Sequence, residues 1–277
     1  MFGHWDLGFG ALYKGGLVYR IGWFSSGRDE AARKLLSTIF DAIQRGEIPA
    51  EIMFVFSNQE PGESPESDRF LELGRKYDLP IVTFSSARFK PKMRADAKND
   101  PQTMKKWRQE YDEEVANRLS RYNPDLIILA GYMLIVSKVL CQKFKMVNLH
   151  PALPKGPVGT WQEVIWELIE EKALHAGAMM HLVTEELDQG PPLTYFSFPL
   201  QGASFDKLWK DEDKNPLFNE IRLQGVKREM PLIFWTLKKL AEGEIKIEDT
   251  RVFKGEKLLK EGLRLNQEIE EYRKRGG

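Results

Sequence analysis

The 277 residues carry 41 basic and 41 acidic side chains, so the formal net charge is zero. That balance lacks the positive excess of a dedicated nucleic-acid-binding protein, and the single cysteine, Cys141, excludes an intrachain disulfide and any multi-cysteine metal site. No stretch is apolar over the length of a membrane span, and the start of the chain lacks the pattern of a secretory signal. We therefore expect a cytoplasmic protein that acts on small molecules, with no nucleic acid and no membrane as partner.

Short apolar runs alternate with helical patterns through the first half of the chain. The apolar runs predict buried strands at 18–24, 50–57, 80–84, 125–130 and 146–149. Helical spacing predicts helices at 29–44 and 66–77 and one long amphipathic helix through Trp107, Tyr111, Val115 and Leu119. Polar composition predicts surface loops at 58–65 and 86–100. This alternation is typical of βαβ units in a mainly parallel sheet, in which ligands bind beyond the carboxyl ends of the strands.

The second half departs from strict alternation. Its pattern predicts a helix at 164–171, strands at 176–184 and 193–199 around a turn at 185–190, a mostly helical stretch at 214–240, a hairpin at 251–259 that turns at Lys254 and Gly255, and a terminal helix at 265–273. Pro231 is expected to kink or break the long helix. We expect an α/β fold with a Rossmann-like sheet at 18–203, an N-terminal extension at 1–17, and C-terminal helices and a hairpin at 204–277.

Two short motifs carry candidate functional residues. Asn148 and His150 form N-x-H-P at the end of a predicted strand, and Asp188 follows about forty residues later in L-D-x-G-P. Alone, an asparagine or aspartate in such a place is more often a turn or cap residue, and a histidine before proline is more often structural. Together, and with Gly131-Tyr132-Met133 ahead of them, the motifs resemble the formyltransferase family, and within it the phosphoribosylglycinamide formyltransferases. The resemblance runs from about residue 19 to 199 and continues more weakly to about 259.

The resemblance implies transfer of a formyl group from 10-formyltetrahydrofolate to a small-molecule amine, without a metal. Asn148 and His150 would donate hydrogen bonds to the oxyanion of the tetrahedral intermediate, and Asp188 would hold the imidazolium and relay the amine proton. A neighbouring carboxylate is expected to keep His150 charged at neutral pH. We expect His181 to be buried, with a structural or supporting role, and His4 and His175 to lie at the surface.

The resemblance also implies where the folate binds. An apolar wall would be formed by Met133, Leu134, Ile135 and Val136, and the pterin edge would meet Val183, Glu185, Glu186 and Leu187. The related enzymes usually carry an arginine where Leu134 stands, so one side-chain contact is expected to be missing.

The match is poorer where the family holds the phosphate of its amine substrate. A glycine-rich S-G-x-G-[ST] turn is replaced here by Ser25-Ser26-Gly27-Arg28, followed by Asp29 and Glu30. Either these four residues bind phosphate, with the forked guanidinium of Arg28 as a donor, or they have a structural role. In the structural role, Ser26 caps the next helix, and Asp29 and Glu30 complement its dipole.

Two further segments depart from the family. The acidic residue expected near Val226 is absent, and Lys227 or Arg228 is expected to compensate as a substrate contact. After His150 the sequence ALPKGPVG replaces the usual SLLPxxxG.

Several acceptors remain open. The best match implies phosphoribosylglycinamide, and another amine such as an amino sugar nucleotide is the runner-up. Hydrolysis of 10-formyltetrahydrofolate uses the same three residues, but those hydrolases carry a domain ahead of the first strand, where we expect fewer than twenty residues here. The neutral charge and the lack of room for an all-β C-terminal domain disfavour methionyl-tRNA formylation, and the intact triad disfavours a non-catalytic folate binder. The oligomeric state stays open.

Overall fold

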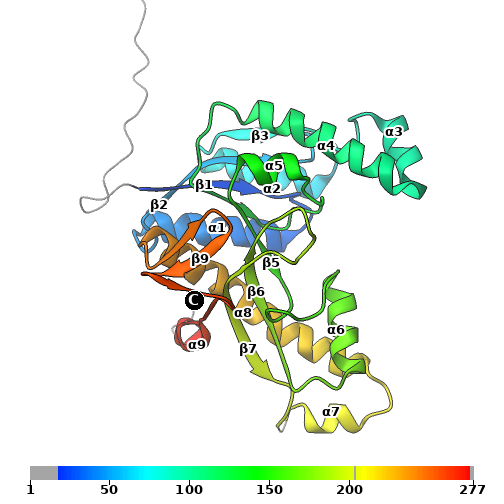
Figure 1. Ribbon diagram of the computed structural model, residues 1–277, viewed down its shortest axis with the longest axis vertical. Helices are drawn as coiled ribbons and strands as arrows, with labels where there is room; N and C mark the ends of the chain where they lie inside the picture. The colour runs from blue at the N-terminus through cyan, green and yellow to red at the C-terminus, as the bar shows by residue number, and fades with distance from the viewer. Residues whose placement is uncertain (1–17, 203, 275–277) are drawn as a thin grey trace, which may run out of the picture.

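The computed structural model describes residues 18–202 and 204–274, so the expected N-terminal extension and His4 lie outside the described residues. Within them, one large sheet has the strand order β11-β7-β6-β5-β4-β1-β2-β3 (Figure 1). Its strands are β1 (Tyr19–Phe24), β2 (Ala50–Ser57), β3 (Ile81–Thr83), β4 (Leu126–Leu129), β5 (Met146–His150), β6 (His175–Leu182), β7 (Pro192–Pro199) and β11 (Leu263–Arg264). The first five strands are parallel, β6 pairs antiparallel with both β5 and β7, and β11 pairs parallel with β7. The predicted mainly parallel α/β fold is confirmed.

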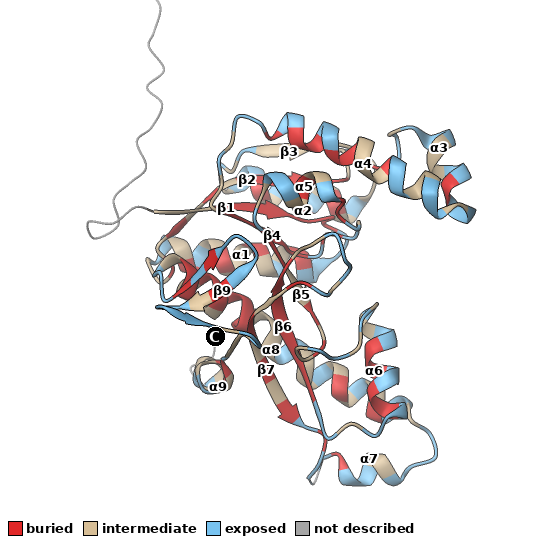
Figure 2. Cartoon of the chain, in the orientation of Figure 1, coloured by how far each residue is buried: buried red, intermediate tan, exposed pale blue. Residues whose placement is uncertain are grey.

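Helices cover both faces of this sheet (Figure 1), and the strands that they cover are mostly buried (Figure 2). One face packs against α1 (Glu30–Gln44), α2 (Pro65–Lys76), α6 (Trp161–Glu170), α8 (Asn215–Ala241) and α9 (Asn266–Lys274). The other packs against α4 (Pro101–Arg118) and α5 (Lys138–Lys143). Apolar side chains alternate between the two clusters along the central strands: Trp23 faces the first and Phe24 the second. Burial on both faces explains why these strands are apolar runs.

The register of the central strands brings three loops together. Phe24 at the end of β1 pairs with Leu129 at the end of β4, and Leu129 pairs with Asn148 near the end of β5. The segments that follow these strands therefore leave the same carboxyl edge of the sheet side by side. This is the edge where a parallel α/β sheet binds its ligands.

The prediction of a loop at 86–100 was wrong. This segment contains α3 (Pro91–Asp96) and a 3-10 turn (Ala97–Asn99) that leads into α4. Its conformation depends on long-range contacts: the Arg94 guanidinium lies over the Trp107 ring, 5.1 Å from its centroid, and donates to the Ser86 carbonyl at 2.7 Å. The residue pattern within 86–100 could not reveal contacts with α4.

Of the kink or break expected at Pro231, the break was wrong, because α8 continues through this residue to Ala241, and a kink stays a prediction. Leu232, Ile233 and Leu237, on the following turns, are buried in the sheet-facing cluster. Thr236 adds a hydrogen bond of 2.6 Å to Thr194 on β7. Packing and this bond outweigh the one backbone hydrogen bond that a proline removes.

The C-terminal hairpin is confirmed and gains a strand. β9 (Arg251–Lys254) turns at Gly255 into β10 (Lys257–Leu258), and β8 (Ile245–Glu248) pairs with β9 in a small antiparallel sheet. The short α7 (Asp206–Lys210) and the edge strand β11 had not been predicted. No helix within 18–202 or 204–274 is long and apolar enough to cross a membrane.

Candidate active site

The structure brings Asn148, His150 and Asp188 together at the carboxyl edge of the sheet. The first two residues lie on β5, and Asp188 lies in the turn between β6 and β7. The His150 Nδ1 atom is 3.5 Å from Asp188 Oδ2, and only 3% and 9% of these two side chains are exposed. Asp188 has a φ of 55°, in the left-handed region that aspartate tolerates better than most residues. A local turn conformation thus directs the carboxylate back toward β5.

His181 completes this cluster. It lies opposite Asn148 in the β5–β6 register, and its Nε2 atom is 3.5 Å both from Asp188 Oδ1 and from Asn148 Nδ2. The Asp188 carboxylate therefore lies between two imidazoles. Sequence analysis predicted burial for His181 but missed these direct contacts. The available signal was its position near the end of an apolar strand that leads into the turn carrying the aspartate.

Backbone carbonyls fix the protonated nitrogen of both rings. The His150 Nε2 atom is 2.8 Å from the Pro157 carbonyl oxygen, and the His181 Nδ1 atom is 3.0 Å from that of Leu182. Since a carbonyl oxygen only accepts, each ring donates an N–H there. In both rings the other nitrogen faces Asp188, and this is the atom that gains or loses a proton. The cluster is thus arranged to move a proton at two ring nitrogens on either side of one carboxylate.

The loop that follows β5 holds the cluster in place. Besides the Pro157 carbonyl, the backbone N–H of Gly159 donates to Asp188. Gly159 has a φ of 117°, which L side chains rarely adopt. Thr160 then caps α6 in a capping box with Glu163, which fixes the end of the loop. The departure of residues 152–159 from the usual family pattern therefore concerns the segment that orients His150 and Asp188.

The pKa values of the two central groups move in the same direction for different reasons. Burial lowers the pKa of His150, and this outweighs the Pro157 carbonyl and the Asp188 charge, which raise it. Burial raises the pKa of Asp188, but the hydrogen bond from His181, the charges of both imidazoles and the Gly159 N–H together bring it below its ordinary value. These directions favour a neutral His150 ring beside an ionised Asp188, whereas an imidazolium was expected. The motif revealed the neighbouring carboxylate but not the depth of burial, which lowers the pKa of His150.

The predicted folate wall is the loop between β4 and α5. Met133 and Ile135 are exposed, with 61% and 38% of their surfaces accessible, while Leu134 is half-buried and Val136 belongs to the core. Two of the four side chains thus offer apolar surface to a ligand.

The predicted pterin-edge residues lie in the turn that carries Asp188. Glu185, Glu186 and Leu187 are exposed, and Val183 is half-buried. The Glu185 carboxylate forms an ion pair of 3.1 Å with Lys105 on α4. The exposed residues of this turn thus directly precede Asp188 in the chain.

In the predicted phosphate turn, Ser26 does not cap α1. Asp29 is the N-cap and accepts the Ala32 N–H at 2.9 Å. The buried Ser26 hydroxyl instead donates to Asn58 Oδ1 at 2.6 Å and accepts the Met133 N–H at 3.0 Å. Ser26 finds these partners in the loops after β2 and β4, which are far away in the sequence. Local sequence patterns therefore could not predict them.

The remaining residues of this turn divide into buried and exposed. Ser25 and Gly27 are buried, and the Ser25 hydroxyl accepts the Gly27 N–H at 3.1 Å. A Cβ on Gly27 would come within 2.8 Å of Phe70, so only glycine fits there. Arg28 is exposed and has no ion pair with any residue of the described ranges. Its guanidinium is the group of this turn left open to a ligand.

The two basic residues predicted on α8 differ. Arg228 donates to Glu270 on α9 at 2.9 Å and to Gln224 at 2.8 Å, and its guanidinium lies 5.3 Å from the centroid of the Phe198 ring. It joins α8 to α9, so its predicted role as a substrate contact is not supported. Lys227 is exposed. The helical pattern had placed Arg228 on α8 but could not show that α9 lies against it.

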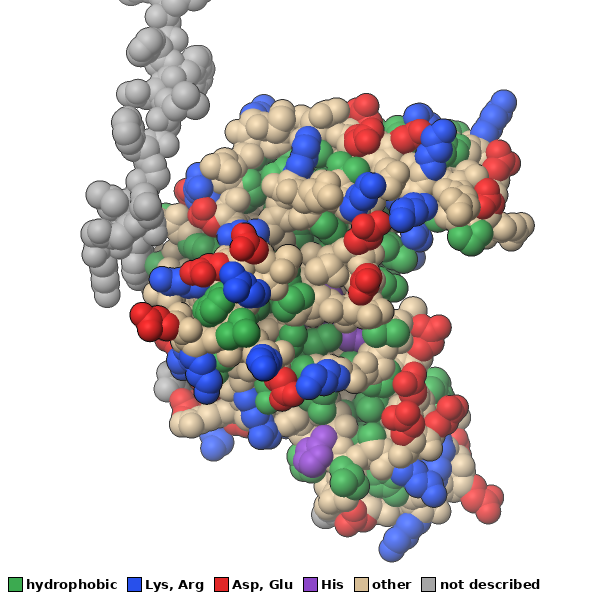
Figure 3. Space-filling model, viewed as in Figure 1, with side chains coloured by type: hydrophobic (Ala, Val, Ile, Leu, Met, Phe, Trp, Pro, Cys, Tyr) green, Lys and Arg blue, Asp and Glu red, His purple; other side chains and the backbone are tan. Residues whose placement is uncertain are grey.

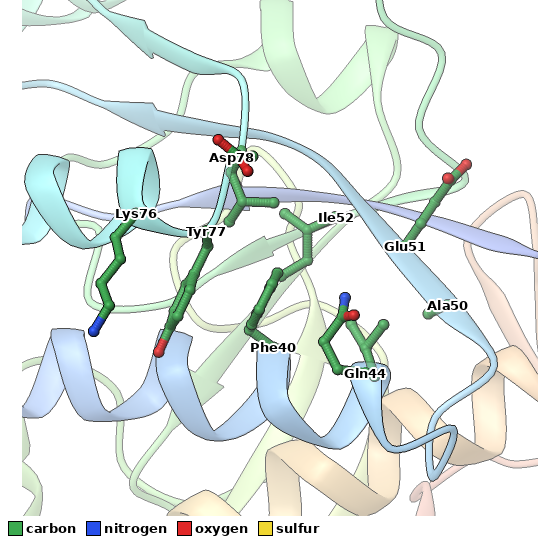
Figure 4. Close-up of a pocket in the computed structure, with 10 residues that line it drawn as sticks. Phe40, Gln44, Ala50, Glu51, Ile52, Lys76, Tyr77 and Asp78 are labelled. Atoms are coloured by element: carbon green, nitrogen blue, oxygen red, sulfur yellow. The ribbon is translucent and has the colours of Figure 1, made fainter. Parts of the chain in front are cut away.

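The molecular surface is hollowed between the part that carries α4 and the part that carries α6, and a histidine side chain is visible within the hollow (Figure 3). A second pocket lies at the opposite edge of the sheet, between the ends of α1 and α2 and the start of β2 (Figure 4). The rings of Phe40 and Tyr77 stack there at 4.1 Å. None of the predicted site residues lines this second pocket.

Comparisons with known proteins identify the family of this chain. A family model described as formyl transferase matches residues 30–201. The phosphoribosylglycinamide formyltransferase of Saccharomyces cerevisiae is 33% identical over 167 residues, which cover 57% of this chain and 74% of the yeast protein. That of Dictyostelium discoideum is 28% identical over 206 residues, which cover 69% and 93%. The crystal structure of glycinamide ribonucleotide transformylase 1 from Symbiobacterium toebii shares the fold, with a TM-score of 0.61, 24% identity and coverage of 85% and 93%. Since the family model spans more than half of its length, this chain belongs to the formyl transferase family.

Proposed function

We propose that this enzyme transfers the formyl group of 10-formyltetrahydrofolate to the primary amine of phosphoribosylglycinamide. The observation that carries the proposal is the Asp188 carboxylate between the imidazoles of His150 and His181, beside the Asn148 amide. The printed names of the yeast and Dictyostelium relatives support this acceptor. The fold alone would not, because one fold hosts many functions.

The reaction begins when the amine nitrogen attacks the formyl carbon. A new C–N bond forms, and the carbonyl oxygen becomes an oxyanion to which the Asn148 amide donates a hydrogen bond. A preorganised donor of this kind is typically worth about 3 kcal/mol in the transition state. The site is half-buried at Asn148 and almost fully buried at His150, which strengthens such electrostatic contacts.

Proton transfer follows from the neutral state of His150. The attacking amine loses a proton to the ring nitrogen that faces Asp188, and the carboxylate stabilises the imidazolium that forms. The same proton then passes to the departing folate nitrogen as its bond to the formyl carbon breaks, which leaves the formylated amine and tetrahydrofolate. The distances of 3.5 Å around Asp188 are long for hydrogen bonds, but catalytic hydrogen bonds commonly tighten when substrates bind.

We assign substrate contacts in the same framework. Met133 and Ile135 would contact the pterin with their exposed apolar surfaces, and Glu185 to Leu187 would line its edge. Arg28, at the start of α1, would bind the phosphate of the amine substrate. A cytoplasmic location and the absence of a nucleic-acid partner stay predictions from the sequence.

An assay of 10-formyltetrahydrofolate turnover with and without phosphoribosylglycinamide tests the proposal. We expect turnover only when the amine is present. Turnover that is the same with and without the amine would instead indicate a hydrolase, the second candidate. In a hydrolase the same three residues act and water accepts the formyl group. Turnover with another amine but not with this one would keep the chemistry and replace the acceptor.

A further inference from the structure

The loop between β4 and α5 is held at both ends by buried polar side chains from other parts of the chain. At its start, the Met133 N–H donates to Ser26 Oγ at 3.0 Å. At its end, the Ser137 N–H donates to Asp112 Oδ2 at 2.6 Å. Ser26 is fully buried and Asp112 is 3% exposed. The backbone of this loop is thus fixed by contacts that span 107 and 25 residues of sequence.

Asp112 is an unusual residue for its surroundings. It lies on α4 among aromatic side chains, between the buried Tyr111 and Val115, and burial raises its pKa to about 6. Placing a carboxylate there costs free energy that an apolar residue of similar size would not. Its direct hydrogen bond is to Ser137, whose own hydroxyl caps α5. The carboxylate therefore holds the point where the loop enters α5.

Ser26 links the same loop to two others. Its hydroxyl donates to Asn58 Oδ1 at 2.6 Å, and Asn58 Nδ2 donates to Ser86 Oγ at 3.2 Å. The network runs through the segments that follow β1, β2 and β3 and ends at the backbone of the loop after β4. All of these groups lie at the carboxyl edge of the sheet.

Between the two anchors the loop presents apolar side chains to solvent. Tyr132, just before the first anchor, is buried, and its ring centroid lies 5.3 Å from that of Phe24, while Met133 and Ile135 are exposed. An apolar surface on a backbone that is already ordered loses little further entropy when a ligand binds. This anchored loop is therefore better suited to binding the face of a flat ring than a loop that is held only by its own turn.

We propose that Asp112 is a positioning residue for folate binding, which acts together with Ser26 to fix Met133 and Ile135 in the orientation that contacts the pterin. This inference rests on the proposed function, in which that segment is the folate wall. Asp112 does not touch the ligand and acts through the Ser137 N–H. Because Ser26 also belongs to the turn assigned to the amine substrate, Asp112 gives the cleaner test.

The test compares three full-length variants with the wild type. Asp112→Ala removes the acceptor, Asp112→Asn keeps an oxygen that can accept the Ser137 N–H, and Glu113→Gln changes the exposed neighbour on the same helix as a control. We measure tetrahydrofolate binding, the KM of each substrate, and hydrogen exchange of the amides in 133–137. In Asp112→Ala we expect tetrahydrofolate binding to weaken roughly tenfold, the KM of the amine to stay within about twofold, and exchange at Ser137 to accelerate. Asp112→Asn should restore binding and protection, and Glu113→Gln should match the wild type.

Three results would overturn the inference. Unchanged exchange at Ser137 in Asp112→Ala would show that the carboxylate does not hold the loop. Equal weakening of both substrates, or no rescue by Asp112→Asn, would reduce Asp112 to a general structural role. If the alanine variant does not fold, Asp112→Leu, which fills the site with an apolar group, takes its place. Failure of the wild type to bind tetrahydrofolate would reject the proposed function, and with it the folate role of Asp112, whereas the exchange measurement would still decide whether Asp112 holds the loop.

Discussion

The proton-transfer centre and the predicted amine side of the site use their polar groups in opposite ways. Around Asp188, the His150 and His181 side chains are buried and oriented by backbone carbonyls. On the amine side, Arg28 is exposed and has no ion pair within the described ranges, and Arg228 donates a hydrogen bond to Glu270. In the proposed function, the chemical step relies on residues at strand ends and turns, whereas binding of the amine substrate relies on an exposed side chain, Arg28.

The largest effect is expected from Asp188→Asn. The amide cannot stabilise the imidazolium of His150, so kcat should fall by a factor on the order of 10² or more with the fold intact. Steady-state kinetics with circular dichroism measures both. Asp96→Asn, an exposed change on α3, is the matched control. A near-normal rate in Asp188→Asn would remove the proton relay from the account.

Arg28→Ala tests the amine side. Loss of the guanidinium should raise the KM of phosphoribosylglycinamide roughly tenfold and leave that of 10-formyltetrahydrofolate unchanged. Lys34→Ala, at an exposed position further along α1, controls for a general change in surface charge. An unaltered KM in Arg28→Ala would mean that other groups hold the phosphate.

Arg228→Ala should separate stability from recognition. The side chain is 14% exposed and joins α8 to α9, so its removal should lower the free energy of unfolding by about 1 kcal/mol. Urea denaturation measures this change, and neither KM should move. A raised KM for the amine with an unchanged free energy of unfolding would indicate that Arg228 contacts the substrate.

The smallest expected effect is a shift in the titration of His150. The Asp188 charge raises the pKa of this imidazole, although burial keeps the net value below that of a free histidine. Asp188→Asn should therefore lower the His150 pKa further, so that its neutral form persists to more acidic pH. NMR titration of the ring resonances measures it. A pKa that rises in this variant would show that the carboxylate does not favour the charged ring.

The comparison also explains how far sequence reasoning reached. Alternating apolar runs predicted the parallel strands, because burial on both faces leaves a clear mark on composition. The short motifs placed Asn148, His150 and Asp188, since strand ends and turns are local features. The bonds from Ser26 to Asn58 and from Arg228 to Glu270 could not be predicted, because each joins residues more than thirty positions apart that only packing brings together. The expected positive charge on His150 differs from the pKa direction for the same reason, because burial depends on the whole fold.

The fate of the formyl carbon tests the central claim most directly. The enzyme is given 10-formyltetrahydrofolate with an isotopic label in the formyl carbon, together with phosphoribosylglycinamide, and the products are followed by NMR. The account predicts that the label appears in the formamide of the glycinamide product. Release of the label as free formate in the presence of the amine would contradict it.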